Sequence, residues 1–147
     1  MTDTPLAGTV ALVTGASRGI GAATAIALSR LGAHLVLTAR TQGGLEETDD
    51  AIRAQGGSAT LFPLDLREAD RIDPLGQAIF QRFGRLDALV HCAGLGGPVR
   101  LVEKDGSPGS LEKYESIVRI NLIGTFNMIR LASAAMIQNT PDAEGER

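Results

Sequence analysis

Three glycines lie between an apolar segment and a helical segment near the start of the chain. Residues 10–13 (Val-Ala-Leu-Val) are a short continuous apolar run, typical of a strand that is buried on both faces. Gly15, Gly19 and Gly21 follow it directly, and helical periodicity begins there. Glycines let the backbone approach a pyrophosphate, and a helix N-terminus offers free N–H groups and a positive dipole end. The arrangement predicts a dinucleotide-binding turn; the alternative is a turn that only connects strand to helix.

Two arginines near this turn indicate which dinucleotide it would bind. An acidic residue after the second strand would bind the ribose 2′-hydroxyl of NAD. Here the expected strand at residues 35–38 is followed by Ala39 and Arg40, with no carboxylate. Arg40 can make a bidentate contact with a 2′-phosphate, and Arg18 in the turn offers a second cation. Both predict NADP, with NAD less favoured, unless both are solvated surface arginines.

Alternating strands and helices must position these residues. We expect strands at 10–13, 35–38, 59–64 and 86–92, and helices at 20–31, 45–54, 74–83 and 111–138. This order predicts an α/β fold with a doubly wound parallel sheet and right-handed crossovers. Along the first helix Ile20, Ala23, Ala27, Leu28 and Leu31 share one face.

Several single residues refine this expectation. Pro63 cannot donate to a ladder, so we place its strand at a sheet edge. Pro74 fits the first position of a helix that Asp73 caps. Ser110 can cap the long final helix, which is apolar on more than one face and is therefore buried or packed on another subunit. Residues 94–110 should form a loop, and 139–147 a polar tail.

Composition narrows the class of protein. The 147 residues, 44% of them hydrophobic, suit one domain with an aliphatic core, since aromatic residues make up only 3%. A net charge of −3 with no basic stripe argues against nucleic acid. The chain has a single cysteine, no basic, apolar leader and no apolar run of about 18 residues. We expect a cytoplasmic protein with no disulfide, metal site or membrane partner.

The turn Thr14–Gly21 resembles the TGxxxGxG motif of the short-chain dehydrogenases/reductases, and the resemblance extends over almost the whole chain. It implies a Rossmann-type sheet, truncated here after the fourth strand and a long helix, in a single incomplete domain over 1–147. In that family an acidic residue after the third strand contacts adenine, and an Asn-Asn-Ala-Gly motif ends the fourth strand. His91 and Cys92 replace both asparagines; we interpret them as packed side chains rather than a base or a nucleophile. The expected dinucleotide-binding set is Gly15, Ser17, Arg18, Gly19, Ile20, Gly21, Arg40, Asp65, Leu66, Cys92, Ala93 and Gly94.

The same resemblance implies a catalytic scheme of which one member is present. Family members use a Ser, a Tyr, a Lys four residues after the Tyr, and an Asn in a proton relay. Asn121 matches the relay position; it could instead be a buried Asn bonded to backbone. The only tyrosine is Tyr114, and Val118 stands four residues later. We therefore predict that this chain alone is inactive.

The region after Cys92 indicates a substrate class. Residues 104–106, 111–112, 124–127, 129–131 and 138–141 resemble type II 3-hydroxyacyl-CoA dehydrogenases. That subgroup uses NAD and has an acidic residue after its second strand, from which Arg40 departs.

Three functions remain open from the sequence. The chain could be the NADP-binding part of an enzyme that transfers hydride between NADP(H) and a carbonyl or alcohol, possibly a 3-hydroxyacyl-CoA. It could be completed by another chain, or it could be a non-catalytic dinucleotide sensor or interaction module. We also expect homo-oligomers formed through the long helix or the exposed edge of the fourth strand.

Overall fold

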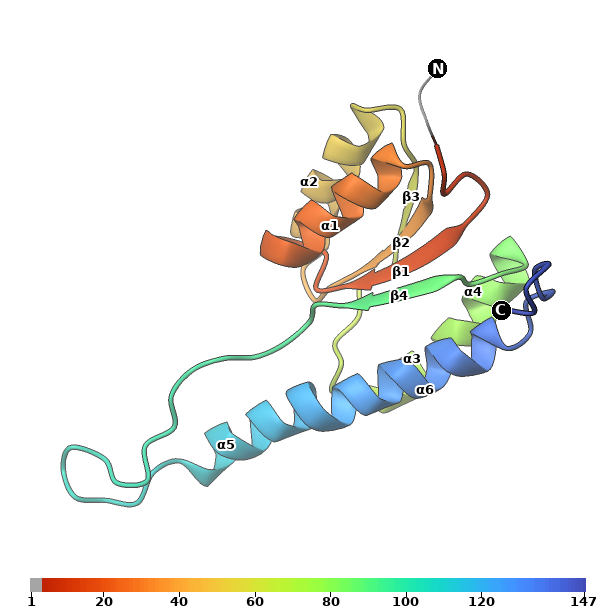
Figure 1. Ribbon diagram of the computed structural model, residues 1–147. Coiled ribbons are helices and arrows are strands. Elements are labelled where there is room, and N and C mark those ends of the chain that lie inside the picture. The colour runs from red at the N-terminus through yellow and green to blue at the C-terminus, as the bar shows by residue number, and fades with distance from the viewer. Residues whose placement is uncertain (1–3) are drawn as a thin grey trace.

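Four parallel strands form the centre of the fold in a computed structural model that describes residues 4–147 (Figure 1). They are β1 (Val10–Thr14), β2 (His34–Thr38), β3 (Ala59–Leu61) and β4 (Ala88–His91), and their order in the sheet is β3-β2-β1-β4. The predicted α/β class and parallel sheet are confirmed. β3 and β4 lie at the two edges, as Pro63 and the strand order suggested.

The register of the sheet brings its functional ends together. Thr14, the last residue of β1, lies opposite Thr38 of β2 and His91 of β4. Because all strands are parallel, the segments that follow them emerge at one edge of the sheet, the usual ligand edge of such folds.

Two strands are shorter than predicted. β3 ends at Leu61 rather than at residue 64, although Phe62 N–H still donates to the Leu37 carbonyl of β2 at 2.8 Å and Leu64 N–H to the Ala39 carbonyl just after β2 at 2.9 Å. The nitrogen of Pro63, between them, faces the open edge of the sheet, where a missing N–H leaves no bond to β2 unmade. β4 covers Ala88–His91 instead of 86–92.

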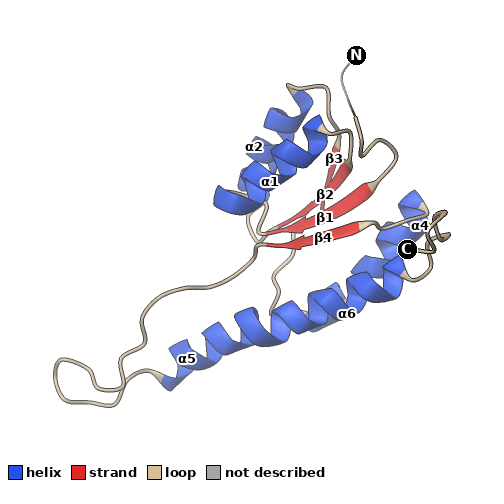
Figure 2. Cartoon of the chain, in the orientation of Figure 1, coloured by secondary structure: helices blue, strands red, loops and turns tan. Residues whose placement is uncertain are grey.

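Helices α1 (Gly19–Arg30) and α2 (Gln42–Arg53) cover one face of the sheet (Figure 2). The prediction of which face of α1 is buried was wrong. Its buried residues are Gly21, Ala25 and Ser29, whereas Ile20 is 78% exposed and Leu31 also faces solvent. Small side chains let α1 approach the sheet closely, and that approach determines which side of an evenly apolar helix is buried.

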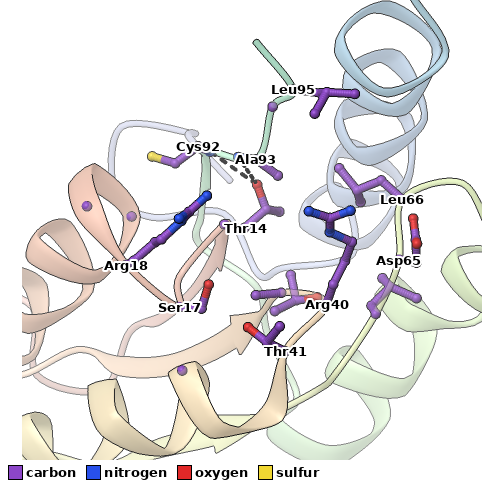
Figure 3. A pocket seen from close by; sticks show the side chains of 18 of the residues that line it. Thr14, Ser17, Arg18, Arg40, Thr41, Asp65, Leu66, Cys92, Ala93 and Leu95 are labelled. Carbon is purple, nitrogen blue, oxygen red and sulfur yellow. Dashed lines mark hydrogen bonds between the residues drawn. The ribbon is translucent and has the colours of Figure 1, made fainter. Parts of the chain in front are cut away.

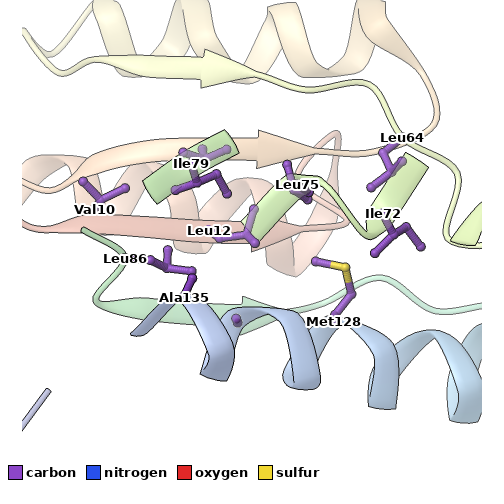
Figure 4. Close-up of a cluster of buried hydrophobic side chains, with 11 residues drawn as sticks. Val10, Leu12, Leu64, Ile72, Leu75, Ile79, Leu86, Met128 and Ala135 are labelled. Carbon is purple, nitrogen blue, oxygen red and sulfur yellow. The ribbon is translucent and has the colours of Figure 1, made fainter. Parts of the chain in front are cut away.

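The opposite face is covered by α3 (Ala69–Ile72), α4 (Leu75–Phe83) and α6 (Thr125–Met136). Their side chains meet those of β1 and β2 in an aliphatic cluster (Figure 4). Asp73 does not cap α4 as predicted. Pro74 occupies the cap position itself, and the Asp73 carboxylate accepts a hydrogen bond from Arg130 at 2.6 Å.

The long C-terminal helix has three parts rather than one. Lys113 N–H donates to Ser110 Oγ at 3.1 Å, so the predicted cap of α5 (Leu111–Val118) is confirmed. A π-helical segment, η1 (Arg119–Gly124), then leads into α6, which ends two residues earlier than expected. Figure 1 shows the preceding loop, 95–110, extending away from the sheet to the start of α5.

Asn139 is not part of a polar tail. It is 9% exposed, its Oδ1 accepts from Leu86 N–H at 3.2 Å, and its Nδ2 donates to the Leu86 carbonyl at 2.7 Å. It thus fixes the segment that enters β4. Within residues 4–147, no helix is long and apolar enough to span a membrane.

Candidate functional site

A cleft of about 660 Å³ opens at the carboxyl ends of the strands (Figure 3). Its walls come from the β1–α1 turn, the end of β2 and the segments that follow β3 and β4. The structure brings all the residues of the expected dinucleotide-binding set into this one lining: Gly15, Ser17, Arg18, Gly19, Ile20, Gly21, Arg40, Asp65, Leu66, Cys92, Ala93 and Gly94.

Glycine is required in the turn by close backbone approach. Gly15 has φ +64°, and a β-carbon there would lie 2.8 Å from the Ala93 nitrogen. A β-carbon on Gly21 would overlap the Gly15 carbonyl oxygen. The turn, the first residues of α1 and the segment after β4 therefore pack backbone to backbone, a geometry that larger residues would prevent.

The N-terminus of α1 opens into the cleft. The Arg18 side chain makes no capping hydrogen bond there, and the first turn of α1 has no acidic residue. The free N–H groups and the positive end of the helix dipole are thus available to an anion, as phosphate binding requires.

Helix α2 supports the turn from the side, a role that the sequence reasoning missed. The Thr48 hydroxyl donates to the Ala16 carbonyl at 2.8 Å and is also within 3.1 Å of the Gly44 carbonyl. A β-carbon on Gly44 would lie 2.8 Å from Ser17 Cβ. The position of Thr48 one turn after buried Leu45 was the available signal, because it places the hydroxyl on the buried face of α2.

Charge on the second-strand side of the cleft is mixed. Arg18 and Arg40 are both exposed and line the cleft, together with Glu47. Asp65 makes a salt bridge to Arg67 at 2.5 Å, and the pKa of its carboxyl is lowered mainly by the hydrogen bonds from the Arg67 side chain. Asp65 is therefore ionised at neutral pH, and Arg67, which sequence reasoning did not single out, fixes its orientation.

One buried polar atom in the lining has no partner in the described residues. Thr38 is 1% exposed and its Oγ1 makes no hydrogen bond. An orphan hydroxyl at a cleft wall is consistent with a site that a polar ligand completes. The close-packed glycines and the free helix N-terminus fit the pyrophosphate of a dinucleotide in the same cleft.

The segment after β4 is held by a threonine of β1. Thr14 Oγ1 accepts hydrogen bonds from the N–H groups of Cys92 and Ala93, both at 3.1 Å (Figure 3). His91 packs beside them and bonds through both ring nitrogens. Our interpretation of Cys92 as a small side chain packed in the core was wrong. It is a free cysteine, partly exposed, in the cleft wall.

Asn121 lies on η1, outside this cleft, and is not buried. Its Oδ1 accepts from Leu95 N–H at 2.8 Å and its Nδ2 donates to the Leu95 carbonyl at 2.9 Å. The oxygen and the nitrogen of the Asn121 side-chain amide thus both hold the loop after β4. Tyr114 is 56% exposed on α5 and does not line the cleft.

Comparison with known proteins places these residues in a chain that is similar to short chain dehydrogenases. Residues 9–144 match the family model for short chain dehydrogenases. The chain is 33% identical over 141 residues to the 3-hydroxyacyl-CoA dehydrogenase type-2 of Rattus norvegicus, covering 95% of this chain and 53% of that protein. It is 39% identical over 124 residues to the fatty acyl-CoA reductase of Acinetobacter baylyi, covering 84% and 40%. The chain thus spans about half the length of the curated relatives it matches.

Solved structures agree with the fold. A short chain dehydrogenase of Pseudomonas syringae superposes with a TM-score of 0.82 at 32% identity, covering 96% of this chain and 57% of that one. A metagenomic short-chain oxidoreductase in complex with NADP gives 0.80 at 34% identity, covering 96% and 68%.

Proposed function

Because this chain belongs to the short-chain dehydrogenase family, we propose that it forms the nicotinamide-dinucleotide-binding part of an oxidoreductase. The observation that carries this proposal is the cleft at the strand ends, where the glycine turn and the free N-terminus of α1 lie together. In it, Gly15 and Gly21 would receive the pyrophosphate, and Asp65 and Leu66 would contact the adenine.

The preferred cofactor is NADP rather than NAD. Arg40 follows β2, where a carboxylate would select the 2′-hydroxyl, and Arg18 lies in the same lining. Both guanidinium groups are exposed and can reach toward a 2′-phosphate. The NADP complex of the metagenomic relative supports this assignment.

The parent reaction is hydride transfer between the nicotinamide and a carbonyl or alcohol. When bound, the dinucleotide supplies or accepts the hydride, and this chain binds and orients it. The similarity to 3-hydroxyacyl-CoA dehydrogenases type-2 favours a 3-hydroxyacyl-CoA or 3-oxoacyl-CoA substrate. The residues present bind the cofactor without turnover, because Tyr114, the only tyrosine, lies outside the cleft and Val118 stands where a partner Lys would be.

Self-association would use the long helix or β4. β4 is an edge strand in the described sheet, and the helix carries large exposed apolar side chains. These include Leu122, Phe126 and Ile129, which are 67%, 68% and 51% exposed. Helical spacing puts the three along one stripe, the pattern of a helix that packs on a second copy.

A second candidate function is a dinucleotide sensor or interaction module without catalysis. The cleft favours it, because all the residues of the expected dinucleotide-binding set line it. Adding NADPH and a 3-oxoacyl-CoA tests the absence of turnover that both candidates predict. Steady loss of NADPH absorbance would contradict our proposal that this chain alone is inactive; a flat trace with binding agrees with it.

Calorimetric titration of NADPH and NADH tests the central proposal. We expect NADPH to bind about tenfold or more tightly than NADH, since a charge-assisted hydrogen bond contributes about 1.5–3 kcal/mol. Arg40→Ala should remove most of this preference, whereas Arg100→Ala, in the exposed loop outside the cleft, should not. Equal affinities would contradict the role of Arg40, and no binding of either nucleotide would contradict the proposed function.

A further inference from the structure

His91, the last residue of β4, joins two elements that are far apart in sequence. Its Nδ1 lies 2.9 Å from Thr14 Oγ1 on β1, and its Nε2 lies 3.1 Å from Thr125 Oγ1 on α6. Which groups donate is decided by what else the two threonines contact.

The Thr14 end identifies the acceptor nitrogen. A hydroxyl has one hydrogen to donate and two lone pairs that accept. Thr14 Oγ1 accepts from the N–H groups of Cys92 and Ala93, at 3.1 Å each, although the Cys92 N–H is shared with the Thr14 carbonyl at 3.3 Å. The hydroxyl hydrogen is therefore directed to His91 Nδ1, which must be unprotonated.

The Thr125 end gives the same answer independently. Thr125 Oγ1 lies 2.6 Å from the Asn121 carbonyl oxygen, which can only accept. The Thr125 hydrogen is committed to that bond, so Thr125 Oγ1 must accept from His91. Nε2 consequently carries the proton, and the ring is neutral.

We propose that His91 is a positioning residue that links the long helix to the dinucleotide cleft and that its protonation weakens dinucleotide binding. The link is a one-way chain of hydrogen bonds. It runs from the N–H groups of Cys92 and Ala93 through Thr14, His91 and Thr125 to the carbonyl of Asn121. The part that concerns the dinucleotide rests on the proposed function.

Protonation would break this chain at a definite place. An imidazolium donates from both nitrogens, and Thr14 has no lone pair left to accept from Nδ1. Thr14 must then release an amide of Cys92 or Ala93, and both residues line the cleft. The segment that contacts the dinucleotide would lose its fixed position.

The surroundings of His91 favour the neutral ring. Burial lowers its pKa, and no charged side chain in residues 4–147 contributes to the shift. The charged residues of η1 and α6, Arg119 and Arg130, are exposed, and β1 and β4 contain none besides His91. Cys92 is the adjacent titratable group, and Figure 3 shows its side chain pointing away from Thr14.

The tautomer can be observed without any ligand. The chain contains two histidines, so ¹H–¹⁵N spectra of the imidazoles show two spin systems, and His34→Gln assigns them. At pH 7.5 we expect His91 to have a protonated Nε2 and an acceptor-type Nδ1. A protonated Nδ1, or a mixture of both tautomers, would overturn the chain.

Coupling to the cleft is tested by amide shifts in the free protein. As pH falls, the amides of Cys92 and Ala93 should move with the midpoint of His91. His91→Asn keeps a polar atom near Nδ1 and His91→Gln keeps one near Nε2, and neither should show this transition. Thr125→Val and Thr125→Ser should both keep the Nε2-protonated tautomer, because Thr14 still directs its hydrogen to Nδ1. Amides that ignore the His91 midpoint would contradict the coupling.

Binding completes the test. Below the His91 pKa, the Kd for NADPH should rise by up to about tenfold per pH unit beyond the change in His91→Asn. The 2′-phosphate of NADPH also titrates near pH 6. Both proteins bind the same ligand, so the difference between the unmodified chain and His91→Asn reports on His91 alone. Identical pH profiles would overturn the effect on binding. If NADPH bound at no pH, the proposed function would fail, and the ligand-free shifts would still decide the coupling.

Discussion

The α-carbon of Gly15 faces the backbone of Ala93 so closely that a β-carbon would lie 2.8 Å from the Ala93 nitrogen. Gly15 also has φ +64°, a conformation that costs other residues about 1–3 kcal/mol. We therefore expect Gly15→Ala to lower the free energy of unfolding by at least that amount and to weaken NADPH binding tenfold or more. Urea denaturation and calorimetry measure the two effects.

Gly43→Ala is the matched control. Gly43 is exposed in the first turn of α2, and a β-carbon there would meet nothing within 4 Å. Since alanine favours helices, this variant should be neutral or up to about 1 kcal/mol more stable. Equal effects of the two substitutions would contradict the importance of the Gly15–Ala93 approach.

Asn139→Ala should destabilise the protein although it lies far from the cleft. The substitution leaves the buried N–H and carbonyl of Leu86 without partners, at a cost of about 1–3 kcal/mol. Gln138→Ala, at the exposed neighbouring position, should change stability by no more than about 0.5 kcal/mol. Thermal unfolding of both variants checks this, and an unchanged Tm for Asn139→Ala would show that the contact is not stabilising.

Stability should decline in mild acid because of the histidines. The pKa values of His34 and His91 are both lowered, mainly by burial, with the positive charge of Arg82 adding to the effect at His34. In the unfolded chain they titrate near 6.5, so between that pH and the folded pKa the unfolded state binds more protons. The stabilisation from neutral imidazoles is thus complete above about pH 6.5 and is lost as pH falls through the folded pKa.

Urea titrations at pH 7.5 and 5.5 measure this loss. His34→Gln and His91→Gln should each reduce the difference in unfolding free energy between the two pH values. The Asp65 carboxyl, whose pKa is lowered chiefly by hydrogen bonds from Arg67, contributes only below about pH 4, so it does not confuse this window. A stability that stays constant from 7.5 to 5.5 in the unmodified protein would refute the prediction.

Phe126→Glu tests association through the long helix. Phe126 is 68% exposed in an apolar stripe, and a charge there would be costly to bury between two copies. We expect the unmodified chain to form dimers at high concentration and Phe126→Glu to shift them to monomers in sedimentation equilibrium. Ala27→Glu, on the exposed side of α1 over the other sheet face, should leave the dimer intact. A monomeric parent protein would contradict the proposal directly.

The sequence was sufficient to predict what depends on local pattern. Asp65, Leu66 and residues 92–94 were predicted from the family resemblance, whereas apolar runs, helix periods and the glycine turn identified the parallel sheet and the β1–α1 wall of the cleft. These features need only short windows, because strand, turn and helix follow each other in βα units. The Ser110 cap is of the same kind, since its partner lies three residues away.

What failed depends on contacts between distant segments. The buried side of α1 is chosen by how closely its small residues approach the sheet, which a pattern of alanines and leucines does not specify. Asp73 pairs with Arg130 rather than capping a helix, and Asn139 pairs with Leu86 rather than ending in solvent. In each case the polar side chain bonds to a group that is distant in sequence, and only the tertiary structure shows which group that is.

The π-helical segment η1 has a consequence for tolerance to insertions and deletions. Such a segment is equivalent to one extra residue within an otherwise α-helical rod. Removing one residue between 119 and 124 would restore a regular α-helix with little change of phase downstream. Winding all six residues as a regular α-helix would instead change that phase by about 100°. Either Asn121 would leave Leu95 or Met128 would rotate out of the core. The extra residue thus lets one rod meet two demands, an outward amide at its centre and a buried methionine two turns later.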